Sequence, residues 1–256
     1  MNQKDKAIAY QIFLYLAALF ITSLVVSNLI FQKFFYWYPI DTKVFGIPLF
    51  ELSVGILPYP ITFLITDLIS EIFGQKKANQ VVVAGIFASF FSIGILLLAD
   101  FMPAIPSSPI GDETFSQVFS LSPLAVLASM IAYLCAQFVD IRIYHFWKKK
   151  TQGKQLWLRN NFSTFASQFL DTLTVILLLC VFQVLPWNMF TGLVISGFIF
   201  KVLIAAIDTP FLYLFVYLIR KRFSLKAGEE IQVSFCTIFF ITLDLATTRT
   251  VVEFST

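Results

Sequence analysis

Two pairs of polar residues stand at the same spacing within apolar surroundings. Gln137 and Asp140 are three residues apart, and so are Gln168 and Asp171. In an α-helix this spacing puts both side chains of a pair on one face, where an amide and a carboxylate together offer hydrogen-bond donors and acceptors. The chain therefore presents the same donor–acceptor pair twice. A chance echo and an inverted repeat of two antiparallel helices both explain this repetition.

Ionisable residues also occur inside long apolar stretches. There are seven of them: Asp67, Glu71, Asp140, Arg142, Asp171, Lys201 and Asp208. Each such group costs roughly 2.5–3.5 kcal/mol at the centre of a membrane-spanning helix. Together they would cost on the order of 20 kcal/mol if they faced lipid. We therefore expect them to face inward, toward one another or toward water.

The composition indicates a polytopic membrane protein. Of the 256 residues, 58% are hydrophobic and 13% are charged, against about 45–50% and about 25% in soluble domains. This composition excludes a soluble enzyme, a disordered chain and a disulfide-stapled secreted domain. Apolar surface on this scale needs lipid as its solvent.

Six stretches are long and apolar enough to cross a bilayer as helices, since a span needs roughly 20 mostly apolar residues. They cover residues 10–32, 49–73, 78–100, 122–146, 161–184 and 188–219. Lys and Arg concentrate before the first span, after the second, between the fourth and fifth, and after the sixth, so the positive-inside rule places both termini in the cytoplasm. We predict an all-α bundle of six transmembrane helices over residues 1–222. A cytoplasmic C-terminal tail follows over residues 223–256, and we assign it no structure.

The fifth span carries a polar stripe along one helical face. The stripe consists of Asn160, Thr164, Ser167, Gln168, Asp171 and Thr174. Asp171 and Lys201 of the sixth span both fall near the bilayer midplane, so we expect them to be partners. A structural ion pair and a substrate or proton role both remain open for them. Asp67, Asp140 and Asp208 lie nearer the cytoplasmic side, where an acid is less costly.

The second span is expected to be broken in its outer half. Pro58 and Pro60 remove two backbone donors there. Below the break, Asp67 and Glu71 are four residues apart on one face, and Gly74 is a stop signal. Broken helices at membrane depth occur where they line a cavity or are buried in protein, which favours a site-lining helix over a kink that only aids packing.

The sequence lacks the residue patterns that are typical of enzyme active sites. The one histidine, His145, is at the end of the fourth span, and no zinc, haem or nucleotide-binding motif is present. We therefore expect no catalytic residue, no metal, no cofactor and no nucleic-acid partner. A Ser–Lys dyad that uses Lys201 is a remote alternative.

Four separated motifs, in order along the chain, resemble those of the queuosine-precursor transporter family, also called the vitamin uptake transporter family. They are Asp67-Leu-Ile-Ser-Glu71-Ile-Phe-Gly74, Gln137-Phe-Val-Asp140, Asn160-Asn161-Phe-Ser163-Thr164 with Gln168-Phe-Leu-Asp171-Thr172, and Lys201 with Asp208-Thr209-Pro210. The resemblance runs over about residues 10–222. It does not extend to the tail.

The resemblance implies a six-helix protein of the bacterial inner membrane, similar in outline to the substrate-binding subunits of energy-coupling-factor importers. Its substrate would be a 7-deazaguanine precursor of queuosine, whose donors a carboxylate can accept and whose ring aromatic faces can hold. On this basis the predicted substrate-binding residues are Asp171, Gln168, Asp140, Gln137, Lys201, Asp208 and Asn161. An inner gate or proton relay is assigned to Asp67, Glu71 and Arg142.

Three other functions stay open at this point. The chain is a candidate capture subunit of an ATP-driven importer, an intramembrane enzyme or a passive channel. A capture subunit needs a surface of small residues on which its partner docks, and Ala17-Ala18 in the first span is a poor candidate for it. Interior charges of mixed sign make a poor pore lining. A solitary secondary transporter is therefore favoured.

Overall fold

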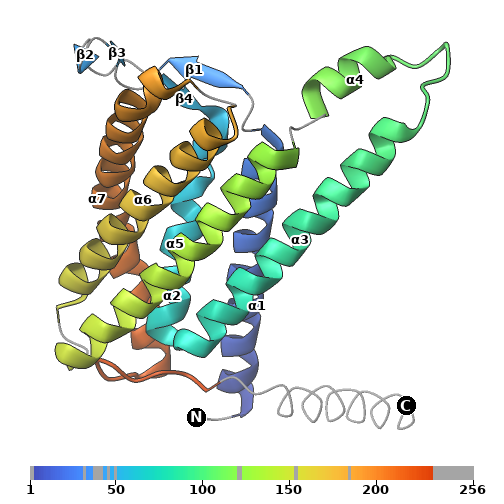
Figure 1. Cartoon of the computed structure of the whole chain (residues 1–256). Coiled ribbons are helices and arrows are strands. Elements are labelled where there is room, and N and C mark those ends of the chain that lie inside the picture. Colours follow the sequence, from blue (N-terminus) through green and yellow to red (C-terminus); the bar gives the residue numbers. More distant parts are fainter. Residues whose placement is uncertain are drawn as a thin grey trace, which may run out of the picture.

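The chain folds into a bundle of long helices. The structure is a computed structural model that describes residues 3–30, 33–36, 43–44, 47–48, 51–119, 123–152, 155–183 and 186–232. Within these residues, six helices are long and apolar enough to cross a membrane. Figure 1 shows them packed into one bundle. The prediction of an all-α polytopic membrane protein is confirmed.

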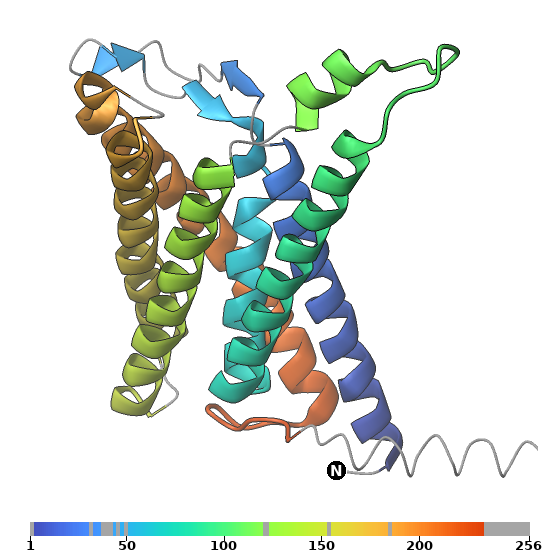
Figure 2. The ribbon, with the colours of Figure 1, turned by 45° about the vertical axis from the view of Figure 1, so that its right-hand side comes forward.

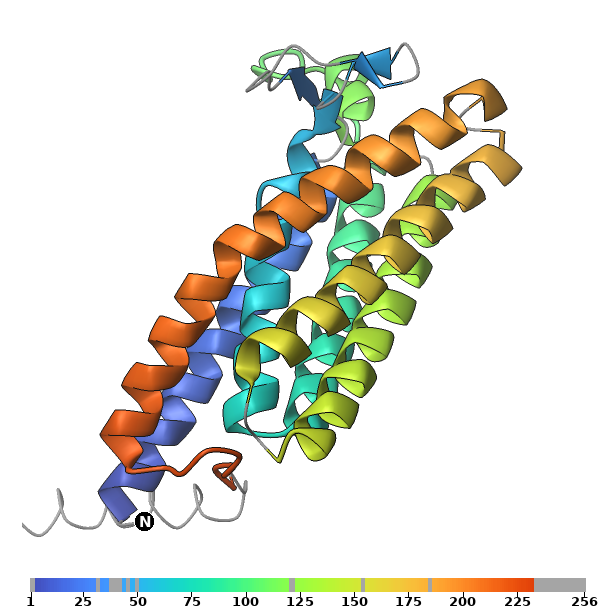
Figure 3. The same cartoon turned by 90° about the vertical axis from the view of Figure 1, so that its left-hand side faces the viewer.

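The spans are built on α1 (Gln3–Ile30), α2 (Tyr59–Ile72), α3 (Gln75–Phe101), α5 (Pro123–Lys150), α6 (Leu156–Val181) and α7 (Phe190–Phe223). The start of α1 and the end of α7 lie at the same end of the bundle (Figures 1 and 3). Arg222 and Asp5 join them there through an ion pair of 3.1 Å. We call this the basic end, because α5 and α7 finish there with the basic runs 148–150 and 220–222.

The second span differs in part from the expected helix over 49–73. Helix α2 begins only at Tyr59, with Pro58 as its N-cap and Pro60 in its first turn, where a missing N–H breaks no helical hydrogen bond. The predicted break is therefore confirmed. The residues before it form β4 (Glu51–Ser53) and the 3₁₀ helix η1 (Val54–Ile56), so the expectation of a helical outer half was wrong. A helix continuing through both prolines would lose two of its hydrogen bonds.

Helix α2 lies at the centre of the bundle. Ten of its fourteen residues are buried, whereas most of α1 and α3 faces outward, as the exposed Phe87 and Phe91 of α3 illustrate. The turn into α3 is made by Gly74, whose φ of +85° suits a residue without a Cβ. The predicted stop at Gly74 is thus confirmed. A central, mostly buried α2 is in a position to present side chains to several neighbours at once.

Short elements at the opposite end of the bundle were not predicted. Strand β1 (Phe34–Tyr36) pairs antiparallel with β4, and β2 (Lys43–Val44) pairs with β3 (Ile47–Pro48). We call this the strand end; Figure 2 shows the strands there, together with α4 (Asp112–Phe119). Asp112 fixes the start of α4 by accepting a 2.7 Å hydrogen bond from the Ala104 N–H. The strand pairs are too short to change the fold class.

Helix α7 is the longest element and crosses the bundle obliquely (Figure 3). It begins after the 3₁₀ helix η2 (Trp187–Met189) and runs for 34 residues, or about 50 Å. This exceeds a hydrocarbon layer of about 30 Å, so the helix must tilt or extend beyond it. Pro210 lies inside α7 without ending it, and the neighbouring Thr209 hydroxyl donates to the Ala205 carbonyl at 3.0 Å.

The residues after α7 turn back across the basic end. The Ile231 N–H donates to the Ile72 carbonyl at 2.7 Å, and the Ile231 side chain joins the hydrophobic core. This contact caps the exposed carbonyl end of α2. The rest of the predicted tail, residues 233–256, lies outside the described residues.

Close packing of α1 against α3 depends on Gly85. A Cβ on Gly85 would lie 2.7 Å from the Phe20 ring and 3.0 Å from Leu24 Cδ2. Phe20 and Leu24 are themselves buried in the core, so neither has room to withdraw. Gly94, on the same helix, has open space where its Cβ would be.

We predict that Gly85→Val lowers the free energy of unfolding by about 1–3 kcal/mol through overpacking. The matched substitution Gly94→Val changes the same residue type on the same helix without a clash, and it should leave stability almost unchanged. Thermal unfolding of the detergent-purified proteins measures both. Equal melting temperatures for the two variants would contradict the packing described for α1 and α3.

Candidate functional site

Helices α6 and α7 bring an acid and a base together at mid-depth. Asp171 lies ten residues before the end of α6 (181 − 171), and Lys201 lies eleven residues after the start of α7 (201 − 190). Both are therefore about 15 Å from the helix ends, near the middle of the hydrocarbon layer. Lys201 Nζ is 2.5 Å from Asp171 Oδ2, and the two side chains are only 11% and 8% exposed. The predicted partnership is confirmed.

Tyr59, the first residue of α2, completes this contact. Its hydroxyl donates to the same Asp171 oxygen at 2.6 Å, and its ring centroid is 4.7 Å from Lys201 Nζ. The ammonium thus gains a cation–π contact in addition to its ion pair. The sequence argument used the prolines around Tyr59 and missed the tyrosine itself. A phenol at the buried start of a broken helix was the available signal.

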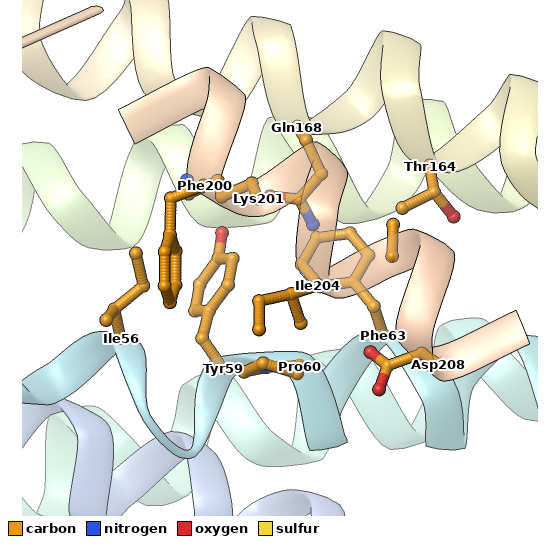
Figure 4. A pocket seen from close by; sticks show the side chains of 11 residues that line it. Ile56, Tyr59, Pro60, Phe63, Thr164, Gln168, Phe200, Lys201, Ile204 and Asp208 are labelled. Carbon is orange, nitrogen blue, oxygen red and sulfur yellow. The ribbon is translucent and has the colours of Figure 1, made fainter. Parts of the chain in front are cut away.

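A narrow cavity lies beside this triad, between α2, α6 and α7 (Figure 4). It is lined by Ile56, Tyr59, Pro60, Phe63, Thr164, Gln168, Phe200, Lys201, Ile204, Ala205 and Asp208. Its volume is about 20 Å³, which is room for about one water molecule. The aromatic rings of Tyr59, Phe63 and Phe200 form part of the wall.

Two of the lining side chains are buried polar groups that lack a partner. Gln168 and Thr164 are each 4% exposed. Within the described residues, neither Gln168 Oε1 nor Thr164 Oγ1 takes part in a hydrogen bond. A buried polar atom without a partner costs about 1–3 kcal/mol. Both side chains are drawn around the cavity in Figure 4, so a ligand entering there would relieve that cost.

A second polar layer lies behind the cavity, on α5. Gln137 donates to the Tyr133 hydroxyl at 2.7 Å, and Asp140 Oδ1 accepts from the Ser167 hydroxyl at 2.9 Å. Both Gln137 and Asp140 are fully buried. The Asp140 carboxyl also contacts Asp67 and Ser163. Within the described residues, Gln137 Oε1 has no hydrogen-bond partner, so this layer, like the cavity wall, contains a buried acceptor that is not used.

Three carboxyl groups gather around this region from three helices. Asp67 of α2 interacts electrostatically with Asp140 of α5 and with Asp208 of α7. Asp67 and Asp140 are buried, and Asp208 is half-buried at the edge of the cavity. The nearest intramembrane base on α7, Lys201, is already paired with Asp171. Among the described residues, this region therefore holds more acidic than basic side chains.

A separate ion cluster joins the helices at the basic end. Glu71 is completely buried and accepts hydrogen bonds from Arg220 of α7 and, at 3.0 Å, from the Tyr144 hydroxyl of α5. Lys148 Nζ lies 3.9 Å from Glu71 and 2.9 Å from Glu230. The cluster ties α2, α5 and α7 together and closes the interior toward this end. The sequence reading of Lys148 and Arg220 as loop charges missed this, because long basic side chains reach back into the bundle from helix ends.

Two predicted site residues lie elsewhere. Asn161 donates to the Trp157 carbonyl at 2.8 Å and accepts from Thr209 at 3.2 Å, so it joins α6 to α7 outside the cavity lining. Arg142 is exposed, so the expectation that it faces inward was wrong. It lies two turns from the end of α5, where a long guanidinium side chain reaches the headgroup region without entering the bundle.

Six helices that are long and apolar enough to cross a membrane, arranged around a polar site at mid-depth, are the architecture of a multi-pass membrane protein with an internal binding site. The comparisons with known proteins agree. The sequence profile described as "Putative vitamin uptake transporter" matches residues 53–215, and the chain belongs to this family of uptake transporters.

A curated relative from Bacillus subtilis (strain 168) is named "Probable queuosine precursor transporter". It is 28% identical over 176 residues, which cover 67% of this chain and 73% of the relative. The matched profile spans the cavity residues from Ile56 to Asp208. No solved structure matches the chain.

We predict that Lys201→Met destabilises the protein by about 3–5 kcal/mol, because it leaves the Asp171 carboxylate buried and unpaired. The double variant Lys201→Met with Asp171→Asn removes both charges and should recover most of the loss. Lys149→Met, at an exposed position of α5, is the control and should have little effect. Thermal unfolding in detergent measures all three. A double variant no more stable than Lys201→Met alone would show that the pair is not the buried contact described.

Proposed function

We propose that this chain is a solitary secondary transporter that brings a 7-deazaguanine precursor of queuosine into the cell across the bacterial inner membrane, with both termini in the cytoplasm. The family assignment makes it an uptake transporter, and the name of the relative supports the substrate class. The observation that carries the proposal is the mid-depth cavity, in which the buried side-chain oxygens of Gln168 and Thr164 have no hydrogen-bond partner among the described residues.

The cavity wall suits a planar, donor-rich heterocycle. A 7-deazaguanine offers N1–H and exocyclic amine donors beside one carbonyl acceptor. The side-chain amide of Gln168 can both accept from such donors and donate to the carbonyl, and the rings of Tyr59, Phe63 and Phe200 line the cavity that would hold the heterocycle. Lys201, which Asp171 holds from outside the cavity lining, completes the wall at mid-depth. Asp140 and Gln137 stand behind this wall as a second layer of acceptors.

A narrow cavity must widen to admit a substrate of this size, and the structure offers two closures that alternate in our proposal. Toward the strand end, Ile56 and Tyr59 close the cavity at the broken start of α2. Toward the basic end, the cluster around Glu71 holds α2, α5 and α7 together. We assign Glu71 to the inner gate. Asp67, one turn from Glu71 and in electrostatic contact with Asp140, connects that gate to the site as a proton relay.

Uptake of radiolabelled 7-deazaguanine precursor tests the proposal directly. We predict that Asp171→Asn abolishes uptake while the protein still reaches the membrane, and that Gln168→Leu lowers the uptake rate at least tenfold, because it removes an unpaired acceptor at nearly constant volume. Gln117→Leu, on the exposed face of α4, is the matched control. Wild-type uptake by both site variants would exclude the cavity as the substrate site.

The same assay in liposomes that contain only this chain separates a solitary transporter from a capture subunit. Uptake without ATP or a second protein supports the proposal. Binding without uptake would instead assign the chain to an ATP-driven importer. Recovery of chemically altered substrate from the vesicles would indicate an enzyme.

A further inference from the structure

We propose that the cavity selects for the positively charged member of the substrate class, and that Asp208 binds its ammonium group. This inference rests on the proposed function and deepens it. It starts from the polar groups around the cavity that make no hydrogen bond. Within the described residues, the side-chain oxygens of Gln168 and Gln137 and the Thr164 hydroxyl have no hydrogen-bond partner.

Several donors of the same region are, by contrast, already engaged. Lys201 Nζ and the Tyr59 hydroxyl both donate to Asp171 at 2.5 and 2.6 Å. The Gln137 amide donates to Tyr133, and the Ser167 hydroxyl donates to Asp140. The side-chain oxygens of Gln168 and Thr164 are therefore open to donors that a ligand brings, while the Gln168 amide N–H groups and the Thr164 hydroxyl are available to a ligand carbonyl.

The charge balance points in the same direction. Asp208 lines the cavity, and within the described residues it has neither an ion pair nor a hydrogen bond. Asp67 is a further acid in electrostatic contact with both Asp208 and Asp140. Lys201 does not neutralise Asp208, because it is paired with Asp171. A cationic ligand group at Asp208 would be attracted by its carboxylate, and the low dielectric of the interior strengthens that attraction.

The arrangement also fixes where the ammonium would lie. Lys201 and Asp208 are seven residues apart on α7, which is about 10 Å along the helix. Figure 4 shows Gln168 near Lys201, with Thr164, one turn away on α6, and Asp208 farther along the cavity. In this proposal, a bicyclic ring held at Gln168 between the aromatic faces directs a short aminomethyl substituent toward Asp208. A primary amine of this kind is protonated at neutral pH.

Equilibrium binding of two ligands that share one ring tests the inference. The ligands are 7-aminomethyl-7-deazaguanine, which carries the ammonium, and 7-cyano-7-deazaguanine, which is neutral. Their dissociation constants are measured with the purified full-length protein by competition against radiolabelled aminomethyl compound and, separately, by direct binding of radiolabelled cyano compound. We expect the wild type to bind the aminomethyl compound at least tenfold more tightly.

Variants at Asp208 then assign the preference to its carboxylate. Asp208→Asn should lower the affinity for the aminomethyl compound at least tenfold and for the cyano compound much less, so that the ratio approaches one. Asp208→Glu keeps the charge and should retain most of the preference. Asp112→Asn, at the exposed start of α4, is the matched control and should leave the ratio unchanged.

The outcomes separate this inference from the proposed function. Equal affinities in the wild type, or tighter binding of the cyano compound, would overturn the inference and leave the proposed function intact. An equal loss for both ligands in Asp208→Asn would also overturn it, since the carboxylate would then serve a general step such as binding a coupling proton. Binding of neither ligand by the wild type would refute the proposed function, and the inference with it.

Discussion

Hydrocarbon cannot solvate a charge, and this constraint organises the interior of the protein. Among the described residues, four acids and one base lie on buried helix faces at membrane depth, and each contacts a polar side chain of another helix. They are Asp67, Glu71, Asp140, Asp171 and Lys201. Because a lipid-facing position would cost each of them several kcal/mol, the helices that carry them must turn these faces toward one another. The central, mostly buried α2 follows from this requirement. It provides Tyr59 for the mid-depth pair, Asp67 for the acid cluster and Glu71 for the cluster at the basic end.

The two ionic groups differ in a way that bears on transport. The cluster at the basic end is balanced, since its two acids, Glu71 and Glu230, face its two bases, Arg220 and Lys148. It has the character of a closure that holds three helices. The mid-depth region is unbalanced, because its base is used by Asp171 while Asp208 faces the cavity without a cation among the described residues. An unpaired carboxylate beside a cavity is what a binding site for a cationic molecule requires, and it is the reason that we propose such a site here.

The sequence predicted those features that follow from periodicity and from the cost of burying charge. The six spans, the break at Pro58 and Pro60, and the pairing of Lys201 with Asp171 all have such causes. What it missed depends on side-chain reach, which spacing does not encode. Tyr59 bonds an acid on a helix more than a hundred residues away, and Lys148 turns back from a helix end to meet Glu71. Arg142 shows the opposite case. Its position within a span suggested an interior side chain, but the long side chain is exposed.

The central claim is that the polar interior of the bundle is a ligand-binding site. The most direct measurement is the melting temperature of the purified protein against increasing concentrations of purines, deazapurines and water-soluble vitamins. A ligand that binds only the folded state stabilises it by RT ln(1 + [L]/Kd), or about 2.7 kcal/mol at a hundredfold excess over Kd. Our account predicts a rise that continues with the logarithm of the concentration for aminomethylated 7-deazaguanine and is absent for the vitamins. A melting temperature unaffected by every deazapurine up to its solubility limit would contradict it.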